Sequence, residues 1–235
     1  MRRTSRMLAA VLLAAPLAAA GAPLAAVPAQ AAASLYRLST AVDPDGVVHV
    51  TRWGHCRTVH FRVNVSLLPE ARRDAGVTMV RAATARLTKA SGIPFAYDGR
   101  TTRMPKPGNI GGEKTGIVIA WTDAAHTPYL TTTGPLGVGG VHWVMSTSGS
   151  GWKVTVTHGF VVLNWPLAKG LPGTLLAQGP SRPLLISHEL GHAVGLEHAG
   201  DDGQVMFATM TPTTPGHYAA GDLAGLARVG NPKGC

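Results

Sequence analysis

The sequence predicts an α+β fold with a mixed β-sheet. Three features of its apolar pattern lead to this prediction. An alternating strand pattern comes first, a long amphipathic helical pattern follows it, and several further strand patterns precede two helical patterns near the end of the chain. This order, in place of a regular alternation of strands and helices, is typical of α+β proteins.

The first 31 residues are expected to be removed from the mature protein. They contain the basic stretch MRRTSR, a short apolar run with Pro16 in it, and an A-x-A site at Ala29-Gln30-Ala31. This is the pattern of a secretory signal peptide, so we expect a secreted, extracellular protein. A membrane-spanning helix is the alternative, which Pro16 disfavours. Residues 32–56 then form an N-terminal arm or a short pro-segment, and residues 57–235 form one folded domain.

Local patterns predict the individual elements. Residues 57–65 alternate between apolar and polar side chains, as a half-buried strand does. A helix is expected from Pro69 to Gly92, since proline suits a first turn and glycine a helix end. Its apolar stripe consists of Val77, Val80, Ala83 and Leu87. Further strands are expected at 94–99, 116–122, 141–146 and 159–165, and the second of these is apolar enough to be buried on both faces.

The remaining segments are expected to be loops and two helices. Residues 32–50 are small and polar, which indicates a turn or a loosely held arm. Loops are expected at 100–115, 123–140 and 199–216. A second helix should run from Ser181 or Arg182 to about Gly195, and a last helix should occupy 218–230.

The net charge limits the classes of partner that the protein is expected to bind. The formal charge of +9 falls to +6, from 18 Lys and Arg against 12 Asp and Glu, once Arg2, Arg3 and Arg6 leave with the signal. The basic residues are scattered, which favours a soluble basic surface; attraction to an acidic wall polymer or substrate is the alternative. Nucleic-acid binding is disfavoured because no basic stripe alternates with aromatic residues. No apolar run after the signal is long enough to cross a membrane.

The segment SHELGHAVGLEH, residues 187–198, contains the candidate metal ligands. His188 and His192 lie four residues apart, so on a helix both imidazoles point to one side and can bind one ion. Glu189 is poorly angled to bind the same ion but can reach a water molecule on it. His198 can join the two histidines only if the helix stops, and Gly195 allows this because glycine accepts a positive φ.

Three neutral imidazoles with an open fourth position favour a catalytic Zn²⁺ ion. Such an ion lowers the pKa of its bound water to about 7. Glu189 is then expected to be the general base, which takes a proton from this water and gives it to the leaving amine. A chance match or a purely structural histidine cluster is the alternative.

Cys56 and Cys235 are the two cysteines of the chain. An even number of cysteines in an oxidising exterior predicts a disulfide, here between the first strand region and the last residue. Cys56 as a thiolate ligand of the metal is the alternative. It is disfavoured because Cys56 lies too close to the first strand to reach freely across a cleft.

The stretch HELGHAVGLEH resembles the metzincin zinc peptidases, whose signature is H-E-x-x-H-x-x-G-x-x-H followed by a Met-turn. By this resemblance Met206 is the Met-turn methionine, packed beneath the histidines, and Met210 is the alternative. The short gap from His198 to Met206 and the segment YAAGDLAGL (218–226) are most similar to matrixins. Small secreted matrixin-like proteases of actinobacteria resemble more of the chain, at Trp53, Cys56, 59–64, 117–121, 161–164 and the final Gly-Cys.

The resemblance also implies a metzincin fold. This fold has a twisted mixed sheet, an active-site helix below the cleft, an upper lobe to about residue 195 and a small C-terminal subdomain, the lower lobe, over 196–235. An antiparallel edge strand pairs with extended substrate in such enzymes, and 138–146 is the candidate here. The loop 207–218 would wall the S1′ pocket and set the side-chain preference.

The chain also departs from the family. Ala208 stands where some relatives carry a tyrosine that helps to hold the oxyanion, and Tyr218 fits the last-helix motif better. The PRCGxPD cysteine switch of the large matrixins is absent from the sequence. Large matrixins also bind a structural zinc and calcium. Here His126, His142 and His158 could bind a second zinc, and Asp201 and Asp202 could bind Ca²⁺, but separate histidines and a solvated acidic loop are favoured.

These features together predict a secreted, monomeric zinc endopeptidase that acts on protein or peptide substrates. His188, His192 and His198 are the expected ligands, and Glu189 is the expected catalytic residue. Two alternatives stay open. One is a zinc-dependent amidase of cell-wall peptides, which the basic charge favours, and the other is a non-catalytic binding protein stabilised by zinc. The presence of Glu189 argues against the second, because a purely structural site needs no base.

Overall fold

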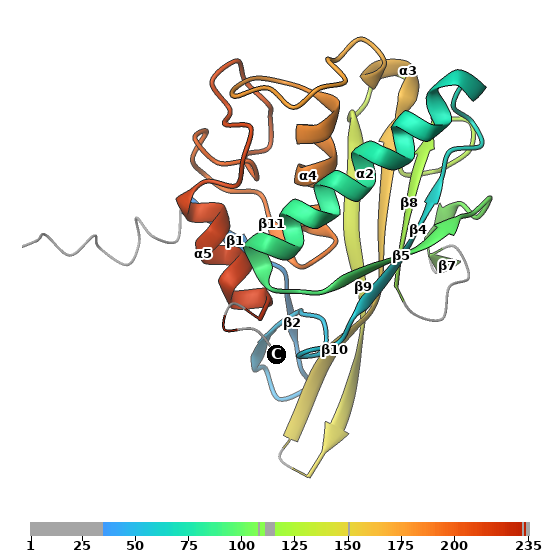
Figure 1. Ribbon diagram of the computed structural model, residues 1–235. Coiled ribbons are helices and arrows are strands. Elements are labelled where there is room, and N and C mark those ends of the chain that lie inside the picture. The colour runs from blue at the N-terminus through green and yellow to red at the C-terminus, as the bar shows by residue number, and fades with distance from the viewer. Residues whose placement is uncertain (1–34, 108, 111–115, 150, 232, 234–235) are drawn as a thin grey trace, which may run out of the picture.

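The computed structural model describes residues 35–107, 109–110, 116–149, 151–231 and 233. The predicted signal peptide, residues 1–31, lies outside them. The described chain is a mixed α+β structure with a five-stranded sheet, as expected. Figure 1 shows the long helix α2 (Glu70–Ser91) running diagonally across the molecule, and α2 packs against the shorter helix α4 (Arg182–His192).

The sheet is mixed, with parallel strands on one side and an antiparallel pair on the other. Its strand order is β5-β4-β8-β10-β9, and only the pair β10–β9 is antiparallel. The bounds are β4 Val59–Asn64, β5 Phe95–Arg100, β8 Gly116–Thr122, β9 Gly137–Ser148 and β10 Gly151–Asn164. β8 is central and buried throughout, which confirms its predicted burial on both faces. β9 forms the edge of the sheet.

Two strands begin earlier than the sequence pattern predicted. β9 begins at Gly137, inside the segment 123–140 that was expected to be a loop, and β10 begins at Gly151 rather than near residue 159. Glycines at the start of β9 disfavour a strand in isolation. They are tolerated because other groups pack closely against them: a Cβ on Gly140 would lie 2.9 Å from the ring of Phe160. The far ends of β9 and β10 form a projecting hairpin, whose polar residues resemble a loop in sequence (Figure 1).

The helices follow the predicted patterns closely. α2 ends at Gly92 with φ of 71°, and its predicted apolar stripe is buried. Ser181 caps α4 by accepting a hydrogen bond from the Leu184 N–H. α4 ends at His192, three residues before the predicted stop, and a turn continues to Gly195. The short helix α3 spans Trp165–Ala168, and the last helix, α5, spans Ala220–Val229.

The N-terminal segment differs from the expected loose arm. Its short strand β1 (Arg37–Leu38) pairs with β11 (Leu196–Glu197), which lies within the candidate ligand segment 187–198. β2 (Thr40–Val42) pairs with β3 (Val48–Val50). Trp53 is only 3% exposed. The segment is held in place by pairing with residues far along the chain. Its own small polar residues give no local sign of this pairing. The segment 100–115, expected to be a loop, contains the two-residue strands β6 (Pro105–Lys106) and β7 (Asn109–Ile110).

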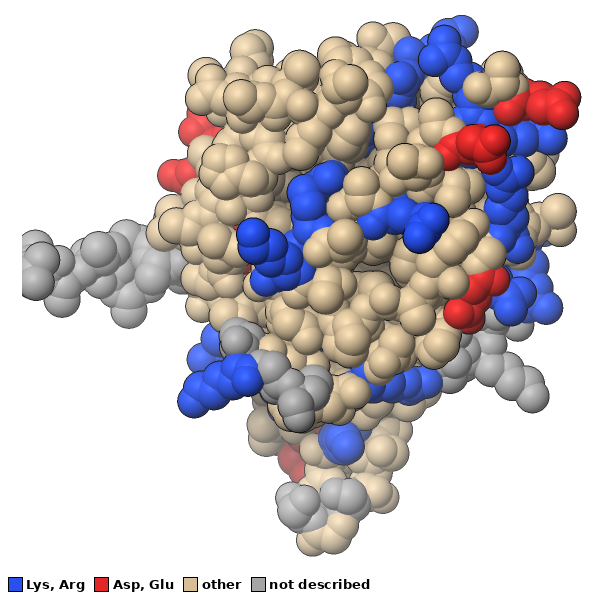
Figure 2. Space-filling view, viewed as in Figure 1, with Lys and Arg blue, Asp and Glu red and all other residues tan. Residues whose placement is uncertain are grey.

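The basic residues are spread over the surface, and several of them contribute to the fold. On the face crossed by α2, Lys and Arg are dispersed rather than gathered in one band (Figure 2). Arg73 donates to the Leu68 and Ser66 carbonyls, and Arg86 donates to the Pro183 carbonyl and the Ser187 hydroxyl. Part of the positive charge therefore serves structural contacts. Among the described residues, no helix has both the length and the apolarity needed to cross a membrane.

Candidate metal centre

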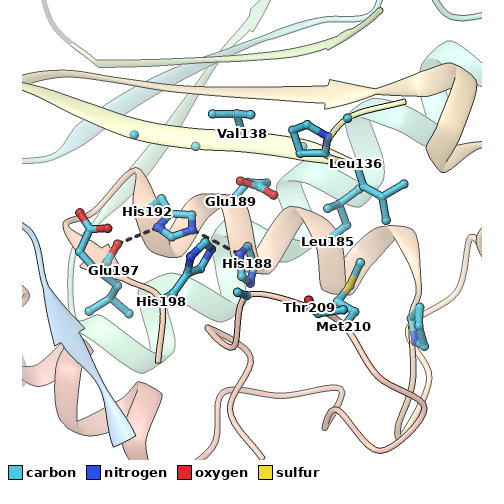
Figure 3. A pocket seen from close by; sticks show the side chains of 18 of the residues that line it. Leu136, Val138, Leu185, His188, Glu189, His192, Glu197, His198, Thr209 and Met210 are labelled. Carbon is cyan, nitrogen blue, oxygen red and sulfur yellow. Dashed lines mark hydrogen bonds between the residues drawn. The ribbon is translucent and has the colours of Figure 1, made fainter. Parts of the chain in front are cut away.

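The three predicted ligands converge at one point (Figure 3). His188 and His192 lie on α4, and His198 follows β11. Their candidate ligand nitrogens lie within 4.8 Å of one another, and the Nε2 atoms of His188 and His192 are 3.3 Å apart. In the described part of the chain, this is the only group of three or more His, Cys, Asp or Glu residues placed so that they could hold one ion.

Backbone carbonyls orient two of the imidazoles. His188 Nδ1 lies 2.7 Å from the Val205 carbonyl oxygen, and His192 Nδ1 lies 2.8 Å from that of Leu196. A carbonyl oxygen can only accept, so each Nδ1 donates a proton. Each Nε2 then keeps its lone pair free, which is the tautomer that a metal ion requires.

Burial keeps these two rings neutral. The pKa of His188 is lowered to about 4, mainly because burial removes water from the charged form, and the nearby His192 lowers it further. Burial also lowers the pKa of His192. Metal ions bind the neutral form of imidazole, so proton competition for these two rings is weak at neutral pH.

The turn after α4 brings His198 back toward the helix. Gly195 has φ of 104°, and its N–H donates to the His192 carbonyl. A Cβ at this position would lie 2.5 Å from the Thr51 carbonyl oxygen. Both the backbone conformation and the available space therefore require glycine, as predicted.

Glu189 is buried between α4 and the edge strand β9. Figure 3 shows it on α4, beneath the strand that carries Val138. A Cβ on Gly137 would lie 2.8 Å from the Glu189 side chain, and one on Gly139 would lie 2.1 Å from the Glu189 carbonyl oxygen. Burial raises the pKa of Glu189 to about 8, while a hydrogen bond from the Gly139 backbone N–H lowers this pKa. A cation bound to the neighbouring imidazoles would also lower this pKa.

A cleft of about 820 Å³ runs between β9 and α4 past these residues. On one side of Glu189, Leu136, Leu185 and Met210 line the cleft (Figure 3). On the other side of the histidines lies the exposed Glu197 (Figure 3). The cleft can therefore receive an extended chain with an apolar side group at one end.

The chain matches no protein-family model and no curated protein.

Met206 lies against α4 rather than in the cleft. It is 1% exposed, and its sulfur would lie 2.3 Å from a Cβ on Gly191. The backbone N–H groups of Val205 and Met206 donate to the Asp222 carboxylate, at 2.8 and 3.0 Å. Val205 is also the residue whose carbonyl orients His188. α5 thus supports the loop beneath the ligands, whereas Met210 lines the cleft.

Ala208 and Tyr218 lie in different surroundings. Ala208 lines the cleft but has no hydroxyl group to offer. Tyr218 is buried, and its hydroxyl donates to the Ser187 carbonyl at 2.8 Å. Burial raises the pKa of Tyr218, so this hydroxyl stays protonated in its structural hydrogen bond.

The structure does not assemble the second set of histidines. His142 and His158 face each other across β9 and β10, whereas His126 bonds Asp123 in a loop. Asp201 accepts hydrogen bonds from the Gly203 N–H and the Gln204 side chain, as in a turn. Asp202, the other acidic residue considered for Ca²⁺, is exposed. Cys235 lies outside the described residues, so the Cys56–Cys235 disulfide stays a prediction.

Sequence reasoning missed several residues that shape the site. Gly137 and Gly139 make room for Glu189, and Trp53 donates its indole N–H to the Ala193 carbonyl. Two glycines spaced by two in a strand point to the same face, which is a signal of close approach by another element. Nothing local to Trp53 identifies its partner, which lies 140 residues away.

Proposed function

We propose that this chain is a secreted, zinc-dependent endopeptidase of the matrixin-like branch of the metzincin clan. One observation carries the proposal: three imidazoles converge beside a buried carboxylate in a cleft edged by a β-strand. A site that only stabilised the fold would have no need for Glu189, whose burial costs solvation energy.

The donor set suits Zn²⁺. Three imidazole nitrogens form a ligand set of catalytic zinc sites, which leave a fourth position open. The hydrogen bonds from His188 and His192 to backbone carbonyls leave their Nε2 atoms available for the ion. When bound, zinc would supply a Lewis acid that polarises a carbonyl group and makes a water molecule more acidic.

Glu189 is the proposed general base. Its carboxylate oxygen takes a proton from the attacking water and later delivers it to the leaving amine. The close packing of Gly137 and Gly139 holds it against β9 on one side of His188. This placement keeps the carboxylate beside the ligands and shields it from bulk water.

The edge strand β9 is the proposed docking site for substrate. Among the described strands it pairs only with β10, so its other edge is available along the cleft. An extended peptide can add there as a further strand through main-chain hydrogen bonds. The apolar part of the cleft lined by Leu136, Leu185 and Met210 would receive an apolar side chain on the S1′ side. Met210 belongs to the loop 207–218, which the resemblance identifies as the wall of this pocket.

Other metzincin features enter as parts of the same proposal. Met206 would be the methionine of the Met-turn, and its packing against Gly191 of α4 supports this. Residues 196–235 would form the lower lobe below the cleft. Two hydrogen bonds join that lobe to the ligand-bearing helix: the Tyr218 hydroxyl donates to the Ser187 carbonyl, and His188 Nδ1 donates to the Val205 carbonyl.

Cleavage of a denatured protein tests the proposal. Glu189→Gln keeps the shape of the side chain but cannot accept the proton, so we expect cleavage to fall by about 10²–10⁴-fold with zinc still bound. The matched control is Glu197→Gln, an exposed carboxylate at the rim of the cleft, which should stay within a few-fold of wild type. A zinc chelator should abolish cleavage, and added zinc should restore it.

Two results would contradict the peptidase proposal. One is equal cleavage by the wild type and Glu189→Gln, and the other is cleavage that a chelator leaves unchanged. Wild-type protein that binds one zinc ion without cleaving denatured protein or cell-wall peptides would favour the binding-protein alternative. Cleavage of cell-wall peptides alone would favour the amidase.

A further inference from the structure

The turn between the second and third ligands is bonded to the N-terminal segment at successive positions. The Trp53 indole N–H donates to the Ala193 carbonyl at 3.0 Å, and the Ser39 N–H donates to the Gly195 carbonyl at 2.9 Å. Next along the chain, β1 pairs with β11, which places Leu38 opposite Leu196 and Arg37 opposite Glu197. His198 follows immediately.

This arrangement matters most for His198. His188 and His192 lie on a helix and have Nδ1 hydrogen bonds to carbonyls. His198 is exposed, and no hydrogen bond to its side chain is found in the described part of the chain. Its position therefore depends on the backbone path from Ala193 to Glu197. Carbonyls at the end of a helix lack partners within the helix, and the N-terminal segment supplies donors to two carbonyls of this turn.

The N-terminal segment is itself anchored to the body of the protein. The Thr51 N–H and hydroxyl both donate to the Ser39 carbonyl, which closes the segment on itself. The Val156 N–H of β10 donates to the Arg52 carbonyl at 3.1 Å. Thr51 and Trp53 are almost fully buried. The segment therefore links the main sheet to the turn that carries His198.

We propose that residues 37–53, here called the N-terminal clamp, position His198 for metal binding, and that the active protein retains them. The inference rests on the proposed zinc site. Removal of the clamp would leave β11 unpaired and the Ala193 and Gly195 carbonyls without these donors. A pro-segment could therefore extend no further than residue 36.

Trp53→Phe tests the clamp because it keeps an aromatic ring but removes the indole donor. Trp152→Phe is the matched control, since it removes an indole N–H bond of the same 3.0 Å length that also involves the clamp, at Asp45, but does not reach the turn before His198. Zinc affinity is measured by competition with a chromophoric chelator, and the ligand geometry is followed through the visible spectrum of the Co²⁺-substituted protein. We expect about 10- to 100-fold weaker zinc binding and an altered spectrum for Trp53→Phe only.

The metal-free proteins are compared by denaturant unfolding, so that a general loss of stability is separated from a loss of positioning. Equal zinc affinity and equal Co²⁺ spectra in Trp53→Phe and the wild type would overturn the clamp. Wild type that binds no zinc would instead overturn the proposed function. If Trp53→Phe does not fold, the mass of the zinc-loaded secreted protein decides. A start at or before residue 37 supports the clamp, and a fully active form that starts after residue 53 refutes it.

Discussion

The position and charge state of each residue in this site depend on the groups in direct contact with it. The ring orientation of His188 depends on one carbonyl, that of Val205, and the neutrality of the ring depends on burial. Glu189 fits under β9 only because two residues of that strand have no side chain. Small changes at neighbours that never touch a substrate should therefore alter the site.

Gly139→Ala should damage the site from outside it. The added methyl group would lie 2.1 Å from the Glu189 carbonyl oxygen, so β9 and α4 must move apart. We expect a loss of about 3 kcal/mol of unfolding free energy and a large loss of cleavage. Gly149→Ala is the control, because a Cβ there would meet nothing within 4 Å. Denaturant unfolding measures both, and equal stability of the two variants would disprove the close-packing argument.

A hydrogen bond between His49 and Asp43 makes part of the clamp sensitive to acid. The Asp43 carboxylate accepts a hydrogen bond from His49 at 2.7 Å, and this bond is the main cause of the lowered pKa of Asp43. A carboxyl group whose pKa is lowered by folding stabilises the protein above its unfolded pKa, and this stabilisation disappears as the pH falls through the folded pKa. His49→Gln should therefore be less stable than wild type at pH 6, and this difference should be smaller at about pH 3, below the ordinary pKa of an aspartate. The same stability difference at both pH values would contradict the pairing.

At the scale of elements, the site is built where α4 ends. The helix presents two histidines at the spacing of one turn, and the following turn returns the third. The loop beneath is tied to α5, because Asp222 accepts the N–H groups of Val205, Met206 and Ala219. The geometry of the ligands therefore depends on both the end of one helix and the start of another.

Gly195→Ala tests the turn. A side chain at this φ costs about 1–2 kcal/mol, and its Cβ would also overlap the Thr51 carbonyl. We expect zinc affinity to fall about tenfold or more, as for other changes that misplace a ligand. Gly99→Ala shares a positive φ, 95°, but meets nothing within 4 Å, so it should lose stability while zinc binding stays normal. Isothermal titration with zinc distinguishes the two, and equal affinities would disprove the role of the turn.

At the scale of the whole molecule, one site joins distant parts of the chain. The clamp, the edge strand β9, α4 and the loop held by α5 all contact the ligand region. A metal ion bound to His188, His192 and His198 would link α4 to the residue after β11, in the folded state alone. Metal binding and folding should therefore be linked.

Zinc should raise the unfolding temperature through this linkage. At free zinc 100-fold above Kd the stabilisation is about 2.7 kcal/mol, which corresponds to roughly 5–10 °C for a domain of this size. His198→Asn should lose this shift. His126→Asn should keep it, because His126 bonds Asp123 and does not join the ligand group. Calorimetry with and without a chelator measures the shift, and metal analysis should find one zinc per chain. An equal shift in His198→Asn and the wild type would contradict the assignment of His198 as a ligand.

Sequence reasoning succeeded where the information was local. The helical spacing of His188 and His192 and the requirement for glycine at residue 195 follow from the geometry of a few consecutive residues. The α+β class, the buried strand β8 and the apolar stripe of α2 also follow from periodicity along the chain. These predictions did not require knowledge of which residues pack against each element.

The sequence by itself therefore determined the candidate ligands and most of the elements. Only the tertiary structure decided that Gly137 and Gly139 of the edge strand pack against Glu189, and that residues 37–53 contact the turn before His198. Such contacts join residues as far as 160 positions apart, as in the pairing of Arg37 with Glu197. The packing and hydrogen bonds that stabilise these contacts form between residues far apart in the sequence. No short window of sequence can therefore predict them.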